Sequence, residues 1–182
     1  SVAPDHKAAA IVEIRAETDF TVKNEKFGAV ADKVVAEALK AAPGDVAATP
    51  TITSEVDSIR IATGENISYA RGKKLAGGAG TRFGSYIHHD GKTGVLIEAT
   101  GDASDELLKS IGMHITAADP RPLGVSIDTI PADVVEKEKK FAIEQAMESG
   151  KPREIAEKMV EGKMRKFYET VALLEQPFVI DP

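Results

Sequence analysis

The sequence contains no cysteine and no tryptophan, and aromatic residues make up 5% of its 182 positions. Without cysteine, a disulfide framework, a thiolate zinc site and a cysteine nucleophile are all excluded. No apolar run approaches the ~20 residues of a membrane-spanning helix, and no charged and then apolar leader opens the chain. These absences predict a cytoplasmic chain with no membrane segment.

The charge balance is acidic, with a net charge of −6 and 29% charged residues. A protein that binds a phosphate backbone is usually basic over at least one domain, so direct binding of nucleic acid is not expected. The hydrophobic fraction of 42% is enough to build a buried core in a chain of this length. One domain or two small ones are therefore expected.

The first part of the chain predicts a strand and then a long helix. Residues 8–15 mix β-branched residues with alternation, which indicates a strand. Apolar residues at helical spacing form a full stripe from Phe27 to Leu39. Asn24 is the expected N-cap of this helix, and Pro43-Gly44 is its stop signal.

A second helix and a second strand are expected next. We predict a loop at residues 49–53, a helix capped by Ser54 and ended by Gly64, and a strand at residues 66–71. The glycine- and alanine-rich stretch 75–80 is typical of a flexible joint. A boundary between two subdomains is therefore predicted there.

Beyond this joint the pattern of a strand before a helix returns. Residues 81–88 and 94–99 indicate two strands connected by an Asp-Gly turn. A helix with an acidic first turn follows and ends before Pro120. Its positions expected to be buried are Leu107, Leu108, Ile111 and Ile115. Residues 10–14 and 95–99 echo each other in sequence, which favours two related α+β halves.

The last part of the chain predicts two charged helices. Pro131 suits position N1 of the first, Gly150 ends it, and Pro152 begins the second. A short connection makes them an antiparallel hairpin, and their largely charged faces predict that it projects from the body. Residues 176–180 predict a short extended piece.

The predicted fold class is α+β, with two related small antiparallel-sheet subdomains packed with helices and a projecting antiparallel helical hairpin. The first subdomain is residues 1–76, and the second is residues 81–130. The hairpin is residues 131–168, and residues 169–182 return to the second subdomain.

Residues 18–24, between the first strand and the first helix, are the leading candidate for a functional site. They place the carboxylate of Asp19 beside the ring of Phe20, where the core has no obvious need for either side chain. Such a link can act as a wedge. Taken alone, Phe20 also suits a core or staple position, and Asp19 suits a helix cap.

The histidines and the charged hairpin leave other functions open. His88, His89 and Asp90 suggest metal ligands, but adjacent strand residues point to opposite faces. His114 lies near an apolar helix stripe, which suits either a histidine packed in the core or a general base. A small hydrolase or metal enzyme using His88, His114 and a carboxylate is one alternative, and a structural protein that dimerises through the hairpin is another. The glycine run lacks the Lys-Ser/Thr ending of a phosphate loop, so no bound nucleotide or other cofactor is expected.

Several motifs, in one order along nearly the whole chain, resemble bacterial elongation factor Ts. They are Thr18-Asp19-Phe20 with Val22-Lys23, Gly64-Glu65-Asn66-Ile67, Gly84-Ser85-Tyr86 with His88, Met113-His114-Ile115, Ser149-Gly150-Lys151-Pro152 with residues 154–162, and Gln176-Pro177-Phe178-Val179.

The resemblance implies a non-enzymatic guanine-nucleotide exchange factor for elongation factor Tu. In that family an aspartate-phenylalanine pair inserts between helices of the GTPase, disturbs its magnesium site and loosens GDP; by motif the pair is Asp19 and Phe20. The resemblance further implies partner contacts at Gly64, His88, Met113 and His114 and through the hairpin, within a heterodimer, a homodimer or a heterotetramer.

The sequence also departs from the family pattern. The family's N-terminal helical module and last strand are not matched, and Thr63 stands where the family often has isoleucine. We therefore expect weaker partner binding than in an intact factor.

Overall fold

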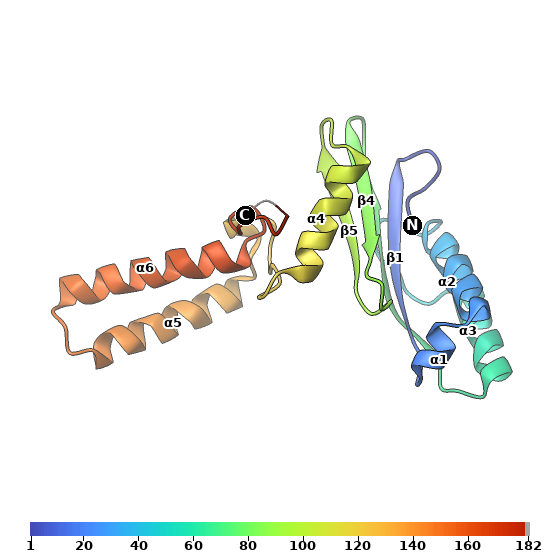
Figure 1. Ribbon diagram of the computed structural model, residues 1–182, viewed down its shortest axis with the longest axis horizontal. Coiled ribbons are helices and arrows are strands. Elements are labelled where there is room, and N and C mark those ends of the chain that lie inside the picture. The colour runs from blue at the N-terminus through green and yellow to red at the C-terminus, as the bar shows by residue number, and fades with distance from the viewer. Residues whose placement is uncertain (181–182) are drawn as a thin grey trace. The chain divides into compact units, whose positions relative to one another are not determined.

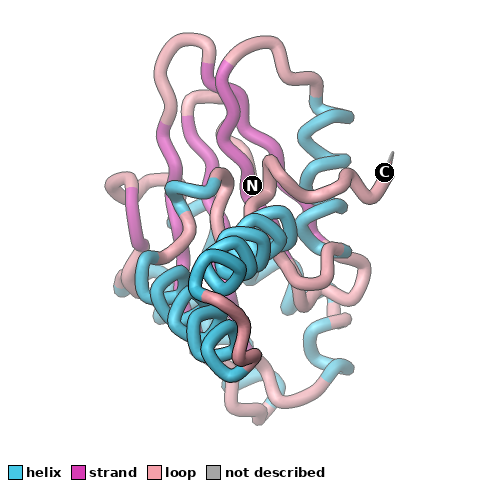
Figure 2. The backbone as a smooth tube through the Cα atoms, turned by 90° about the vertical axis from the view of Figure 1, so that its left-hand side faces the viewer, coloured by secondary structure: helices cyan, strands magenta, loops and turns pink. Residues whose placement is uncertain are grey.

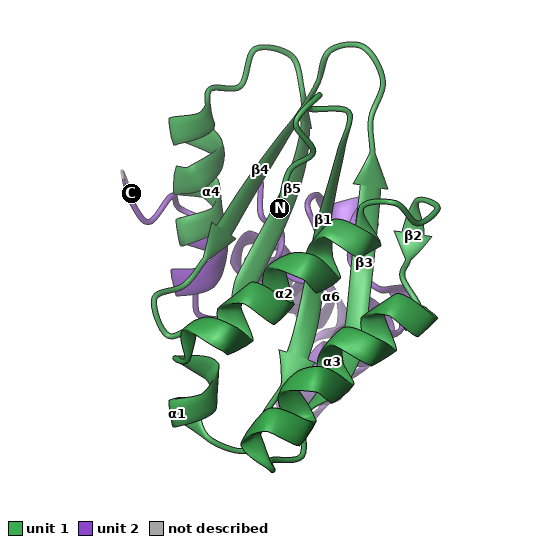
Figure 3. Ribbon diagram, turned by 90° about the vertical axis from the view of Figure 1, so that its right-hand side faces the viewer, with its two compact units in different colours: residues 1–113 green, residues 114–182 purple. Residues whose placement is uncertain are grey.

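The computed structural model describes residues 1–180, and the chain forms two compact units, residues 1–113 and 114–182 (Figure 3). No helix within the described residues is long and apolar enough to cross a membrane. Helices and antiparallel strand pairs confirm the α+β class. The elements, labelled in Figure 1, are β1 (Ala8–Arg15), α1 (Asp19–Val22), α2 (Glu25–Ala38), β2 (Gly44–Asp45), α3 (Pro50–Thr63), β3 (Ser68–Ala76), β4 (Thr81–Ile87), β5 (Gly94–Thr100), α4 (Asp105–Ala117), the 3-10 turn η1 (Ile127–Thr129), α5 (Ala132–Glu148) and α6 (Arg153–Val171).

Unit 1 is built around an antiparallel sheet in the order β1-β3-β2. β1 pairs with β3 from Ala8 opposite Ala76 to Arg15 opposite Ser68. Helices α2 and α3 lie across one face of this sheet (Figure 3). Their apolar sides and the sheet enclose the main core, which includes Phe27, Val34, Ile52 and Ile67.

Helix α2 confirms the predicted apolar stripe. The Asn24 side chain accepts a hydrogen bond of 2.8 Å from the Lys26 N–H and caps the first turn. Phe27, Val30, Val34 and Ala38 are buried at helical spacing. The helix ends at Ala38, before the proline expected to stop it.

Helix α3 begins five residues earlier than predicted, at Pro50 after the cap Thr49, so the expected loop at residues 49–53 and the Ser54 cap are wrong. Thr49 is the N-cap, and its hydroxyl accepts a hydrogen bond of 3.2 Å from the Ile52 N–H. Pro50 fits the first turn because its missing N–H is not needed there. The early start carries Ile52 into the core, where it is fully buried.

Strand β3 runs to Ala76, so the predicted strand of residues 66–71 is too short. β1 offers a partner along its whole length, and pairing of Ala8 and Ala9 with Ala76 and Leu75 overrides the local signal for flexibility. Only residues 77–80 remain as a link to β4. Both sheets belong to unit 1, and a division into subdomains at residues 76–81 stays a prediction.

The β4–β5 hairpin and the part of α4 up to Met113 complete unit 1 (Figure 1). A Cβ atom at Gly84 would lie 2.5 Å from the Leu108 Cβ, and one at Gly112 would lie 2.6 Å from the Tyr86 Cβ. Strand β4 and helix α4 therefore approach each other closely at two points, at Gly84 of the strand and at Gly112 of the helix. Leu108 is fully buried, but Leu107 is 47% exposed, so its predicted burial is wrong. Adjacent helix positions point about 100° apart, and Leu108 takes the inward one.

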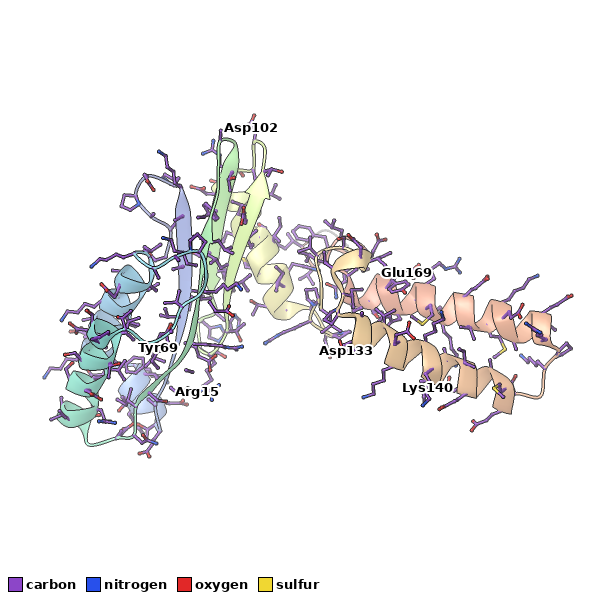
Figure 4. All side chains as sticks on the ribbon, turned by 180° about the vertical axis from the view of Figure 1, so that it is seen from behind. Arg15, Tyr69, Asp102, Asp133, Lys140 and Glu169 are labelled. Atoms are coloured by element: carbon purple, nitrogen blue, oxygen red, sulfur yellow. The ribbon has the colours of Figure 1, made fainter. Side chains whose placement is uncertain are left out.

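Unit 2 contains the helical hairpin, whose helices α5 and α6 run alongside each other (Figure 2). Pro131 and Pro152 are N-caps rather than N1 residues, one position before each helix. Small side chains let the helices approach, since Ala142 and Ala146 are buried between them. Charged side chains such as Asp133, Lys140 and Glu169 extend from the hairpin (Figure 4).

The end of the described chain folds back within unit 2. α6 continues to Val171, three residues beyond the predicted hairpin end, and Ala172 forms a parallel bridge with Gly124. Ile130, Val171 and Ala172 form a small core at the base of the hairpin. The predicted extended piece at residues 176–180 is not a strand; residues 181–182 of the predicted return segment lie outside the described residues.

Candidate functional site

Residues 18–24 form a turn of helix rather than the predicted open link. α1 covers Asp19–Val22, four residues, and the Thr18 hydroxyl accepts a hydrogen bond of 3.3 Å from the Thr21 N–H. A threonine N-cap followed by an acidic residue is a helix-start signal. That signal is present in the sequence, but the segment between the strand and α2 is too short to show helical periodicity.

Phe20 lies on the outer side of this turn and is 90% exposed. Its ring therefore takes no part in the core, and the core or staple interpretation is wrong in this structure. Thr21, the next residue, is 7% exposed and anchors the opposite side of the turn. The turn thus presents one large apolar side chain to its surroundings.

Asp19 pairs with Lys92 from the turn between β4 and β5. The Asp19 Oδ1 and Lys92 Nζ atoms are 3.2 Å apart, and both side chains are 64% exposed. Because a pair this exposed contributes little to stability, the fold does not depend on Asp19. Lys92 belongs to the turn that follows His88, so this turn lies beside α1.

Glu65 holds α1 and was not predicted as a site residue. Its Oε1 accepts hydrogen bonds of 2.7 Å from the Thr18 hydroxyl and 2.5 Å from the Thr21 hydroxyl. Its Oε2 accepts a bond of 3.2 Å from the Thr18 N–H. These hydrogen bonds lower the pKa of Glu65, the one from Thr21 having the larger effect and those from Thr18 the smaller. No local pattern could reveal this contact, because Glu65 and Thr18 are 47 positions apart.

Gly64 ends α3 in the left-handed conformation, with φ of 71°, and its N–H donates to the Arg60 carbonyl oxygen at 2.9 Å. It is exposed and directly precedes Glu65, so the predicted contact lies next to the residue that holds α1. The Thr63 hydroxyl donates to the Ile59 carbonyl oxygen at 2.8 Å. Ile61, which the sequence did not single out, is 80% exposed on the same helix end.

His88 follows β4 and is half-buried. Its Nδ1 is 3.2 Å from the Tyr86 hydroxyl, and its ring centroid is 4.1 Å from that of His89. Among residues 1–180, no three histidine, aspartate or glutamate side chains are placed to hold a metal ion. The Asp90 carboxylate instead accepts a bond of 2.8 Å from the Lys92 N–H, which lowers the pKa of Asp90.

Met113 and His114 are adjacent on α4 but differ in exposure. Met113 is 40% exposed, whereas His114 is 2% exposed. The His114 Nδ1 accepts a bond of 3.2 Å from the Val179 N–H, so its Nε2 carries the proton and donates to the Gln176 Oε1 at 3.2 Å. The imidazole is engaged within unit 2, and a partner contact at this position stays a prediction.

Two surface hollows lie away from the histidines of the hydrolase alternative. One lies on α3 and is lined by residues including Pro50, Thr53, Asp57 and Ile61. Another lies on α5 and is lined by Glu136, Lys137, Lys139, Lys140 and Ile143. Neither contains a histidine.

Comparison with known proteins agrees with the motifs in the sequence. Residues 17–182 match the profile of the family described as elongation factor TS. The chain is 42% identical over 188 residues to elongation factor Ts of Thiobacillus denitrificans and 43% identical over 182 residues to that of Sodalis glossinidius. All of this chain is covered in both cases, but only 62% and 61% of the two relatives. The chain thus spans about three-fifths of their length. On the family profile and these identities, the chain belongs to the elongation factor Ts family.

Proposed function

We propose that this chain is a guanine-nucleotide exchange factor for elongation factor Tu in translation elongation. The turn that carries Asp19 and Phe20 would enter the GTPase near its nucleotide and magnesium site and promote GDP release. The single observation that carries the proposal is the 90% exposure of Phe20 on a turn fixed by hydrogen bonds. Membership of the elongation factor Ts family supports it.

The proposed mechanism is a coupling between two binding events. An exchange factor makes its own binding and that of the nucleotide mutually unfavourable, and this coupling is reciprocal. No covalent bond is made or broken by this chain, so it is not proposed to be an enzyme in the chemical sense. Its side chains instead stabilise a partner geometry that holds GDP less well.

The magnitudes are consistent with a contribution from Phe20. A ~10⁴-fold faster release needs a barrier lower by about 5.5 kcal/mol. Burial of an exposed phenylalanine in the partner contributes about 2 to 3 kcal/mol. The Asp19 carboxylate adds to this by competing for water or hydrogen bonds around the partner's magnesium ion. Since its exposed bond to Lys92 is weak, little is lost when Asp19 changes partner.

Further contacts with elongation factor Tu are proposed at Gly64, His88 and Met113. The hairpin offers another, because Phe141 is 52% and Met147 75% exposed among its charged residues. The same apolar side chains suit a second copy of the chain, which would give a homodimer or a heterotetramer. A cytoplasmic location belongs to the same proposal.

The test is release of a fluorescent GDP analogue from elongation factor Tu. The wild-type chain is expected to accelerate release, and the variant Asp19→Ala/Phe20→Ala is expected to lose the acceleration. The matched control is Leu174→Ala/Glu175→Ala, which also removes an exposed apolar side chain and a neighbouring carboxylate. Absence of acceleration by the folded wild-type chain would overturn the proposal, whether or not the chain binds elongation factor Tu.

A further inference from the structure

Helix α1 cannot hold its shape by itself. It contains four residues, and a single helical turn fixes many torsion angles for very few hydrogen bonds. Its own backbone bonds are long, at 3.4 Å from the Val22 N–H to the Thr18 carbonyl and 3.2 Å from the Lys23 N–H to the Asp19 carbonyl. Contacts from outside α1 must therefore determine where the Phe20 ring points.

The Glu65 carboxylate supplies such contacts from a fixed position. It accepts from the Thr18 N–H, the Thr18 hydroxyl and the Thr21 hydroxyl, and thus holds both the cap and the buried side of α1. Its backbone lies between Gly64, which ends α3, and the β3 strand. Ile67, two residues later, is 2% exposed in the main core and keeps this connection in place.

We propose that Glu65 is a positioning residue for nucleotide exchange, which holds the Asp19–Phe20 turn in the orientation that enters the partner. This inference rests on the proposed exchange function. Only an ionised carboxylate at this position can accept all three bonds. A glutamine retains an amide oxygen for the two hydroxyls but turns an N–H₂ group toward the Thr18 N–H.

Loss of the carboxylate is expected to affect the rate more than the binding. In Glu65→Ala the turn would sample several orientations, and misplacement by about 1 Å can cost up to ~10²-fold in rate. We expect the maximal rate of GDP release to fall about 10- to 100-fold in Glu65→Ala, and to take an intermediate value in Glu65→Gln. Partial unfolding of the chain would instead raise the concentration of the chain needed for half-maximal GDP release and leave the maximal rate of release unchanged.

The first experiment measures GDP release against the concentration of the chain, with Glu55→Ala as the control. Glu55 lies on α3 and its carboxylate pairs with Lys33 at 3.0 Å rather than with Thr18 or Thr21 of the α1 turn. Full activity of Glu65→Ala, while Asp19→Ala/Phe20→Ala is inactive, would overturn this inference and leave the proposed function intact. Inactivity of the folded wild-type chain would overturn the proposed function and the positioning role together.

The second experiment needs no partner and measures the turn itself. Backbone NMR order parameters of residues 19–22 are expected to fall from about 0.85 toward 0.6 in Glu65→Ala, and to stay unchanged in Glu55→Ala. Unchanged order parameters in Glu65→Ala would overturn the inference even if exchange were slower, because the turn would then be held without the carboxylate.

Discussion

Replacement of Gly84 by alanine is expected to push β4 and α4 apart. The added Cβ would lie 2.5 Å from the Leu108 Cβ, about 1 Å less than an ordinary carbon–carbon contact of ~3.5 Å. Neither atom can avoid the other by rotation of a side chain, because both are fixed to the backbone. The strand or the helix must move, and overpacking of this kind costs about 1 to 3 kcal/mol.

The same geometry predicts that Leu108→Ala does not rescue Gly84→Ala, because alanine retains the Cβ that clashes. Urea unfolding followed by circular dichroism measures the loss of stability directly. In a separate thermal unfolding experiment, the melting midpoint should fall by about 2 to 4 °C for each kcal/mol lost. Gly78→Ala is the control, since a Cβ there would meet nothing within 4 Å. Equal stability of Gly84→Ala and Gly78→Ala would refute the close approach of β4 and α4.

Three further results are expected. Phe20→Ala leaves the free energy of unfolding within about 0.5 kcal/mol of wild type, because the ring is exposed. In the GDP-release assay, the acceleration by Phe20→Ala is expected to be about 30- to 160-fold smaller than that by the wild-type chain, the equivalent of 2 to 3 kcal/mol. An equal reduction for Leu174→Ala would show that the effect is unspecific. Leu108→Ala destabilises by about 2 to 5 kcal/mol in denaturant unfolding, and Leu107→Ala by clearly less, since only Leu108 is fully buried. Hydrogen bonds lower the folded pKa of Glu65 below its ordinary 4.5, so their stabilisation is complete above about pH 4.5 and is lost as the pH falls through the lower folded value. NMR should show α1 loosening over that acidic range in wild type, with no such step in Glu65→Gln.

Periodicity and caps predicted the elements that depend on neighbours in the sequence. Asn24 and the stripe from Phe27 mark α2 without ambiguity, since a cap and a helical repeat agree. The strands β4 and β5 and the turn between them were also predicted. Pro50 lies in the loop predicted at residues 49–53 but stands in the first turn of α3, a position that proline also favours.

The parts that sequence patterns missed depend on partners far along the chain. β3 extends to Ala76 because β1 pairs with it, and β2 is a two-residue strand that exists only through its bonds to β3. In the candidate site, Asp19 and Phe20 were singled out from the sequence, but the hydrogen bonds from Thr18 and Thr21 to Glu65 were not. Those bonds join residues 44 and 47 positions apart, and only the folded sheet and α3 bring them together.

The contact between Glu65 and α1 also sets an order of folding events. A four-residue helix has no stability of its own, so it cannot form before the chain around residue 65 is in place. Thr18 and Glu65 are brought within reach of each other when β1 pairs with β3, which sets Arg15 opposite Ser68. We therefore expect the turn that carries Phe20 to become ordered only after β1 and β3 have paired, so that a partly folded chain does not present the ring in a defined orientation.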